Sequence, residues 1–134
     1  MKPECFIIVD DDPYNNILCK FIIEEVLPKA EVFDFTDARK CIEYFRFAYK
    51  KDKKNPEAIL LLDINMPHMN GWEFLEWFGQ CPSYIKDHIS IYLLSSTVDP
   101  RDKERASNHP AIKGFLTKPL EVEMVKEIVD EQLS

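Results

Sequence analysis

The sequence predicts an α/β fold with one five-stranded parallel sheet and five helices, and two observations lead to this prediction. Five short strand-like segments are each followed by a segment with helical periodicity, which is typical of a parallel sheet with right-handed crossovers and helices on both faces. The run at residues 58–62 is apolar throughout, as expected of a central strand covered on both sides. With 134 residues, the chain has the size of one domain, and we expect residues 1–134 to form it.

The first strand is expected at about residues 5–9, and the first helix follows it from Pro13. Asp12 is the expected N-cap, and proline suits the first helical turn because its missing N–H needs no partner there. Apolar residues at helical spacing predict the inward face of this helix: Ile17, Leu18, Phe21, Ile22 and Val26. Pro28 ends the helix, and a short second strand is expected at residues 31–35.

The middle of the chain repeats this order. Thr36 is expected to cap the second helix, whose inward residues are Ala38, Cys41, Ile42 and Phe45. The third strand at residues 58–62 is followed by a loop that reaches Asn70. Gly71 then opens the third helix, whose apolar residues are Trp72, Phe74, Leu75 and Phe78.

The last third holds two more strands and two more helices. The fourth strand is expected at residues 89–94, and Asp99 followed by Pro100 predicts another capped, short helix. The fifth strand ends at Thr117. Apolar spacing predicts a final helix that includes Val122, Val125, Ile128, Val129 and Leu133.

Acidic and basic side chains stand where three of these strands end. They are Asp10 and Asp11 after the first strand, Asp63 after the third, and Lys118 after the fifth, just before Pro119. Parallel strands all end at one edge of the sheet, where open α/β folds bind ligands, so we expect three carboxylates and one ammonium in one crevice. Carboxylates about 5 Å apart repel by about 3 kcal/mol per pair at an effective dielectric constant of about 20, so the cluster implies a bound cation.

The chemistry that fits such a crevice is phosphoryl transfer. Hard oxygen ligands select Mg²⁺, which usually takes further oxygens from water and from a phosphoryl group. Asp63 is the candidate nucleophile, because a carboxylate can attack phosphorus and form an acyl phosphate. Lys118 would neutralise charge on the transferred group, and the Ser95 hydroxyl at the end of the fourth strand would donate to one of its oxygens. Each motif alone has a common structural explanation, and only their joint occurrence at four strand ends favours a site.

Composition and charge disfavour several other classes of protein. The formal net charge is −7, and nucleic-acid affinity rests largely on lysine and arginine at phosphates. No apolar run approaches the ~20 residues of a membrane helix, and the N-terminus does not resemble a signal peptide, so we expect no membrane contact and a cytoplasmic location. Three glycines are too few for a Walker loop or a dinucleotide-binding turn. The four cysteines lack metal-ligand spacing, and we expect free thiols.

Four longer motifs surround the candidate site residues: Ile8–Asp12, Leu61–Gly71, Leu93–Ser96 and Gly114–Pro119. Together they resemble the receiver domain of two-component response regulators, and the resemblance covers nearly the whole chain. It implies a flavodoxin-like, doubly wound sheet similar to that of the chemotaxis receiver, with strand order 2-1-3-4-5. It also implies that Asp63 is the phosphorylated residue.

The resemblance assigns a role to each site residue. Asp11 and Asp63 would bind Mg²⁺ through their side chains, Asn65 would bind it through its backbone carbonyl, and Asp10 would act mainly through water. Lys118 would pair with the phosphoryl group, and its peptide bond to the following proline would be cis.

The resemblance also implies a conformational switch. Phosphorylation adds about −1.5 to −2 of charge, and Ser95 would be drawn toward the phosphoryl group. Phe115, which resembles the switch aromatic of the family, would then turn inward and reshape the face made by the fourth helix, the fifth strand and the last helix. Serine replaces the commoner threonine here, phenylalanine replaces the commoner tyrosine, and a permanently buried core ring is the alternative for Phe115. Asn65 and Thr97 match positions that tune the phosphoryl lifetime in the family.

Partners and alternatives follow from the same resemblance. The phosphoryl group would come from a histidine kinase or a histidine phosphotransfer protein, and the switched face would bind an unknown downstream protein or a second copy of the chain. We expect a stand-alone receiver that catalyses only its own phosphorylation and dephosphorylation. Two alternatives stay open. One is an aspartate-based Mg²⁺-dependent phosphatase, since Asp63-Ile64-Asn65 is vaguely similar to an Asp-x-Asp nucleophile loop. The other is a receiver-like scaffold that is not phosphorylated.

Overall fold

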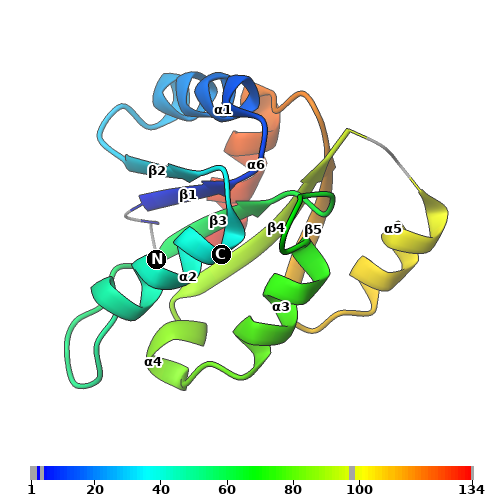
Figure 1. The fold of residues 1–134 in the computed structure, drawn as a ribbon. Coiled ribbons are helices and arrows are strands. Elements are labelled where there is room, and N and C mark those ends of the chain that lie inside the picture. Colours follow the sequence, from blue (N-terminus) through cyan, green and yellow to red (C-terminus); the bar gives the residue numbers. More distant parts are fainter. Residues whose placement is uncertain (1–2, 4, 97–98, 134) are drawn as a thin grey trace.

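The computed structural model of the chain describes residue 3, residues 5–96 and residues 99–133. Their strands form one sheet in which all neighbours are parallel, in the order β2-β1-β3-β4-β5. The strands are β1 (Cys5–Val9), β2 (Glu31–Phe35), β3 (Ala58–Leu62), β4 (Ile89–Ser95) and β5 (Ile112–Thr117). This order confirms the predicted fold class (Figure 1).

Helices cover both faces of the sheet (Figure 1). One face carries α1 (Pro13–Val26) and α6 (Val122–Leu133), and the other carries α2 (Ala38–Ala48), α3 (Gly71–Gly79) and α5 (Pro100–Ser107). A short helix, α4 (Ser83–Lys86), packs on that second face through Ile85. The described residues thus contain six helices instead of five, because a single helical turn has no apolar repeat from which a pattern could predict it. Within these residues, no helix is long and apolar enough to cross a lipid bilayer.

The core has two layers, one on each side of the sheet. Successive strand residues point to opposite faces, so Ile7 and Leu60 belong to one layer, and Phe6 and Ile59 belong to the other. Every residue of β1 and of β3 is buried. The apolar run of β3 is therefore a central strand, as its sequence predicts.

The buried face of α1 is not the one that its apolar pattern predicts. Its buried residues are Asn15, Asn16, Cys19 and Ile23. Four apolar residues are exposed instead: Tyr14 (80%), Ile17 (66%), Leu18 (41%) and Phe21 (62%). Of the predicted set, Ile22 and Val26 do pack against the core. The inward side of the helix is partly polar because two asparagine amides bind Asp10, and the apolar side chains are left at the surface.

The predicted caps of α1 and α5 are confirmed, and that of α2 is wrong by one residue. Asp12 and Asp99 each accept a backbone hydrogen bond at 2.9 Å, and proline follows each of them. Asp37, not Thr36, caps α2, and its carboxylate accepts the N–H of Arg39 at 2.9 Å. Either residue type can cap a helix. The ion pair between Asp37 and the Arg39 side chain further stabilises the aspartate at the cap.

Candidate functional site

The strand ends that carry the acidic residues meet at one edge of the sheet. Val9 of β1 lies opposite Leu62 of β3, so the residues that follow, Asp10 and Asp63, lie side by side. The Asp63 N–H donates to the Val9 carbonyl at 2.9 Å and fixes this alignment. One carboxylate oxygen from each of Asp10, Asp11 and Asp63 lies within 4.8 Å of the other two. The acidic cluster expected from the sequence is present.

Lys118 brings a positive charge into the cluster. Its Nζ lies 2.5 Å from an oxygen of Asp10 and 3.6 Å from an oxygen of Asp63. Its backbone N–H donates to the Ser95 carbonyl at 2.8 Å, and its peptide bond to Pro119 is cis, as the resemblance implies. Burial alone would lower the pKa of Lys118, but the two carboxylates outweigh burial and raise that pKa above its ordinary value of 10.5. The side chain is therefore charged at neutral pH and bridges both buried acids.

Asp10 is held by three further donors. Asn15 donates its amide to the carboxylate at 2.8 Å, and the backbone N–H of Asp12 donates to it at 2.9 Å. Asn16 donates to the backbone carbonyl of Asp10 at 3.0 Å. The sequence-based prediction missed both asparagines. The signal was available, because two adjacent amides in the first turns of a helix that follows an acidic pair can reach back to it.

Asp63 has weaker support than Asp10. Among the described residues, its carboxylate accepts one long hydrogen bond, from the Asn65 N–H at 3.4 Å, besides its contact with Lys118. Burial raises the pKa of Asp63, the charge of Asp10 raises it further, and Lys118 opposes them only in part. A buried carboxylate with few donors keeps its lone pairs available, which suits a nucleophile.

We expect the Asp63→Asn variant to unfold at a higher temperature than the wild-type chain in metal-free buffer near neutral pH. The pKa of Asp63 in the folded chain lies above its ordinary value of 3.8, so the ionised form costs stability at any pH above the folded pKa. Asparagine removes the charge and keeps the shape of the side chain. Below pH 3.8 the carboxyl is protonated in both states, and the difference should disappear. Thermal denaturation with a chelator, repeated across pH, measures both effects. An equal or lower midpoint for the variant near neutral pH would contradict this cost.

The donor set of the cluster suits a hard divalent cation. All its candidate ligand atoms are oxygens, and two of the three carboxylates are buried while Asp11 is exposed, so the cluster has one open side. Three carboxylates and one ammonium leave net negative charge, which a divalent cation would neutralise. Asn65, the fourth expected ligand, follows Asp63 by two residues and has an exposed side chain.

The two expected switch residues lie on neighbouring strands. Ser95 ends β4, the strand beside β3, and is buried. Phe115 lies in β5 opposite Leu93, is half-buried against the core, and lines a cavity of about 390 Å³ between α5 and β5. Its ring therefore has core atoms on one side and open volume on another. Thr97 lies outside the described residues.

The loop after Asp63 is anchored to α3. The Gly71 N–H donates to the Ile64 carbonyl at 2.8 Å, and a Cβ at Gly71 would lie 2.6 Å from the Asp63 carbonyl oxygen. The next residue, Trp72, contacts α5, since the Arg105 guanidinium lies 4.2 Å from the centre of its ring. The start of α3 thus contacts both the candidate nucleophile and the helix that follows β4.

Comparison with known proteins identifies a family. A family model described as the response regulator receiver domain matches residues 6–130. The chain is 32% identical, over 85% of its length, to the cyclic di-GMP phosphodiesterase response regulator RpfG of Xanthomonas campestris pv. campestris (strain 8004). It is 29% identical, over 90% of its length, to the two-component response regulator ARR12 of Arabidopsis thaliana. It spans only 28% and 18% of the length of those two proteins.

Solved structures of similar size agree with this match. A two-component response regulator from Cytophaga hutchinsonii aligns with a TM-score of 0.88 at 29% identity, covering 99% of this chain and 98% of the other. A response regulator receiver protein from Dyadobacter fermentans DSM 18053 aligns with a TM-score of 0.84 at 32% identity, covering 96% of each chain. The chemotaxis response regulator CheY4 of Vibrio cholerae, at 22% identity and a TM-score of 0.73 over 96% of this chain and 98% of its own, shares the fold.

Proposed function

The chain belongs to the response regulator receiver domain family of two-component signalling, and from this premise we propose that it is a switch that accepts a phosphoryl group on Asp63. The observation that carries the proposal is the convergence of three carboxylates and the Lys118 ammonium at the carboxyl ends of β1, β3 and β5. We further propose that residues 1–134 act as one receiver domain, which the near-complete mutual coverage with the Cytophaga hutchinsonii chain supports. A cytoplasmic location stays a prediction.

Asp63 supplies the nucleophile in the proposed reaction. One of its carboxylate oxygens attacks the phosphorus of a phosphohistidine, the new O–P bond replaces the P–N bond, and the imidazole leaves with the electron pair and takes up a proton from solvent. The Lys118 ammonium, 3.6 Å from Asp63, stabilises negative charge on the transferred group. Ser95 donates its hydroxyl to a phosphoryl oxygen. Each of these roles uses a group that ends a strand at the same edge.

Mg²⁺ is the proposed cofactor. Asp11 and Asp63 would hold it directly, with a further oxygen from the Asn65 backbone carbonyl. Asp10 would act mainly through water, which is supported by the engagement of its own oxygens with Lys118 and with two other donors. When bound, the ion supplies positive charge that offsets the charge of the phosphoryl oxygens.

The proposed phosphoryl donor is a histidine kinase or a histidine phosphotransfer protein. Such a partner must cover the edge where Asp63 lies, and α1 begins at that edge, just after Asp10 and Asp11. The exposed apolar residues of α1 recur at helical spacing and form one surface, the α1 stripe: Tyr14, Ile17, Leu18 and Phe21. A contiguous apolar stripe next to the reacting group fits a docking surface for the donor protein.

We expect Phe21→Ser to slow phosphotransfer from a histidine kinase that phosphorylates the wild-type chain by about tenfold or more. Phe21 is 62% exposed, so its loss should leave the core intact and remove an apolar contact with the partner. Uptake from acetyl phosphate, which needs no docking surface, should stay unchanged. The matched control is Phe47→Ser, because Phe47 is 80% exposed but lies on α2. Equal slowing by both substitutions, or by neither, would contradict docking at the α1 stripe.

The proposed output face is formed by α5, β5 and α6. Ala106 is the one buried residue of α5, so this helix contributes little to the core. Arg105 of α5 contacts Trp72. A cavity beside Phe115 lies between α5 and β5. A rearrangement here needs a bias of only a few kcal/mol between two states. The face would then bind a downstream protein or, as the alternative, a second copy of the chain.

The family assignment does not favour the two alternatives that the sequence leaves open, a phosphatase and a scaffold that is not phosphorylated. We propose no catalysis beyond self-phosphorylation and dephosphorylation. The name of one curated relative includes a phosphodiesterase, but this chain spans only 28% of that protein.

Incubation with acetyl phosphate, with and without Mg²⁺, tests the proposed function by intact mass. We expect one added phosphoryl group per chain that appears only with Mg²⁺. No addition under either condition would contradict the proposal, and steady hydrolysis of phosphoesters would favour the phosphatase.

A further inference from the structure

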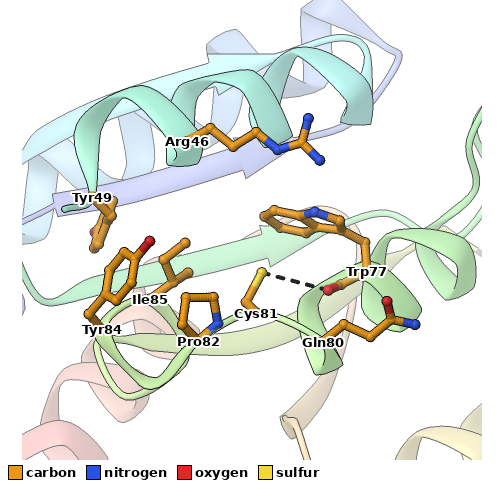
Figure 2. A pocket seen from close by; sticks show the side chains of 8 residues that line it. All are labelled: Arg46, Tyr49, Trp77, Gln80, Cys81, Pro82, Tyr84 and Ile85. Atoms are coloured by element: carbon orange, nitrogen blue, oxygen red, sulfur yellow. Dashed lines mark hydrogen bonds between the residues drawn. The ribbon is translucent and has the colours of Figure 1, made fainter. Parts of the chain in front are cut away.

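A hollow lies between α2, α3 and α4 (Figure 2). Because Asn55, just before β3, binds Tyr84 of α4, the hollow lies near the start of that strand, whereas Asp63 follows its end. Its volume is about 390 Å³, within the range of small-molecule sites. Figure 2 shows that Arg46 comes from α2, Trp77 from α3 and Tyr84 from α4. Cys81 lies between Trp77 and Tyr84. The acidic cluster contributes no residue to this hollow, so the proposed phosphoryl transfer does not account for it.

The aromatic walls of the hollow are fixed by their own contacts. The Trp77 ring stacks on Phe45, with ring centres 6.2 Å apart and planes inclined by 22°. Tyr49 is buried, and its hydroxyl donates to a backbone carbonyl at 2.8 Å. The Asn55 amide donates to the Tyr84 carbonyl at 3.1 Å and so ties α4 to the segment that leads into β3. Walls that are already ordered lose little conformational entropy when a ligand binds.

One cationic side chain, Arg46, lines the hollow in a protein of net charge −7, and Lys86 directly follows the lining residue Ile85 in sequence. Arg39 and Arg101 each pair with an aspartate, whereas Arg46 has no ion pair within the described part of the chain. Lys86 donates to a backbone carbonyl at 3.1 Å and not to a carboxylate. Burial raises the pKa of the Cys81 thiol, and the charges of Lys86 and Arg46 oppose that rise.

We propose that this hollow binds a small molecule in which a flat aromatic ring carries one anionic group, a carboxylate or a phosphate. The ring would lie against Trp77, on whose side of the hollow the Arg46 guanidinium also lies, since aromatic side chains favour offset stacking. The anion would accept hydrogen bonds from the Arg46 guanidinium, whose planar fork matches two oxygens of an oxyanion. The proposal thus gives a use to an arginine that has no anionic partner within the described residues.

A ¹H–¹⁵N NMR titration of the full chain tests this with probes that separate ring from charge. Naphthalene-2-carboxylate and AMP carry both features, naphthalene-2-methanol carries the ring alone, and acetate carries the anion alone. We expect saturable shifts of the Trp77 indole and Cys81 amide signals with at least one of the two anionic aromatic probes. Which of the two binds more tightly distinguishes a carboxylate ligand from a phosphate ligand.

Arg46→Gln should weaken binding of the anionic aromatic probe by about tenfold or more, because a hydrogen bond to a charged group is lost. Arg39→Gln is the matched control on the same helix and should leave binding unchanged. No saturable shift at millimolar probe, equal affinity for naphthalene-2-methanol, or undiminished binding by Arg46→Gln would overturn the proposal. Asp63→Asn should bind the probes as the wild-type chain does, so failure here is distinguishable from failure of the phosphoacceptor proposal.

Discussion

The Asp63→Ala chain should gain no phosphoryl group from acetyl phosphate and Mg²⁺ under conditions where every wild-type chain can gain one. Alanine removes the one of the two buried carboxylates in the cluster that has fewer hydrogen-bond donors than Asp10 and therefore more available lone pairs. The neighbouring acids are poor substitutes. Asp10 already accepts from Lys118, Asn15 and a backbone N–H, and Asp11 is exposed. Intact mass, followed by hydroxylamine treatment to cleave any acyl phosphate, measures the loss.

A matched control for this loss is Asp12→Asn. Asp12 lies beside the cluster in sequence, but its side chain caps α1 by accepting the Tyr14 N–H, and asparagine caps a helix equally well. This variant should take up the phosphoryl group as the wild-type chain does. The Trp72 ring offers a second readout, because Trp72 starts the helix that follows the phosphoacceptor loop. Beryllofluoride should change tryptophan fluorescence in the wild type and not in Asp63→Ala. An equal response in both chains would contradict the assignment of Asp63.

The strands and the acidic cluster are readable from the sequence because each rests on a short, strong pattern. The apolar run of β3 can only be a buried strand or a buried helix, and five residues between turn signals favour the strand. Once the strands are parallel, their carboxyl ends must share one edge, so the proximity of Asp10, Asp63 and Lys118 follows from topology. No long-range contact has to be guessed for this part of the prediction.

The face of α1 could not be predicted from hydrophobicity, because a tertiary contact reverses it. The helical periodicity predicts one apolar stripe that contains Ile17 and Phe21, and such a stripe normally packs against the core. In the structure, Asn15 and Asn16 turn inward to Asp10, and the stripe stays exposed. Exposed apolar residues and buried amides both depart from the usual apolar-inside pattern, and such departures are expected at functional sites.

The remaining differences between the prediction and the structure concern features that no local sequence pattern encodes. The short helix α4 spans four residues, Ser83–Lys86, and its Pro82 cap makes no side-chain hydrogen bond, so neither of the usual helix signals is present. The contact between Arg105 and Trp72 joins α5 and α3, which are separated in the chain by α4 and β4, and no local pattern encodes it. The hollow beside Arg46 likewise depends on how three helices pack.

Gly71→Ala should destabilise the chain by about 3 kcal/mol, the cost of forcing extra volume into a packed site. A Cβ at Gly71 would lie 2.6 Å from the Asp63 carbonyl oxygen and 2.9 Å from the Ile64 Cα, and both neighbours are backbone atoms that cannot rotate away. The melting temperature should fall by roughly 10 °C for a domain of this size. The phosphoacceptor loop must shift to relieve the clash, so phosphoryl uptake should also slow.

Gly79→Ala separates this steric effect from the general effect of replacing a helical glycine. Gly79 ends the same helix, and an added Cβ there meets no atom within 4 Å. Alanine restricts the unfolded chain more than glycine does and favours helix, so this variant should be unchanged or more stable by up to about 1 kcal/mol. Opposite signs for the two substitutions would show that the close approach of Gly71 to Asp63, and not helix propensity, sets the first result. Equal and small effects would mean that the loop can yield without cost and that α3 does not fix the position of the nucleophile.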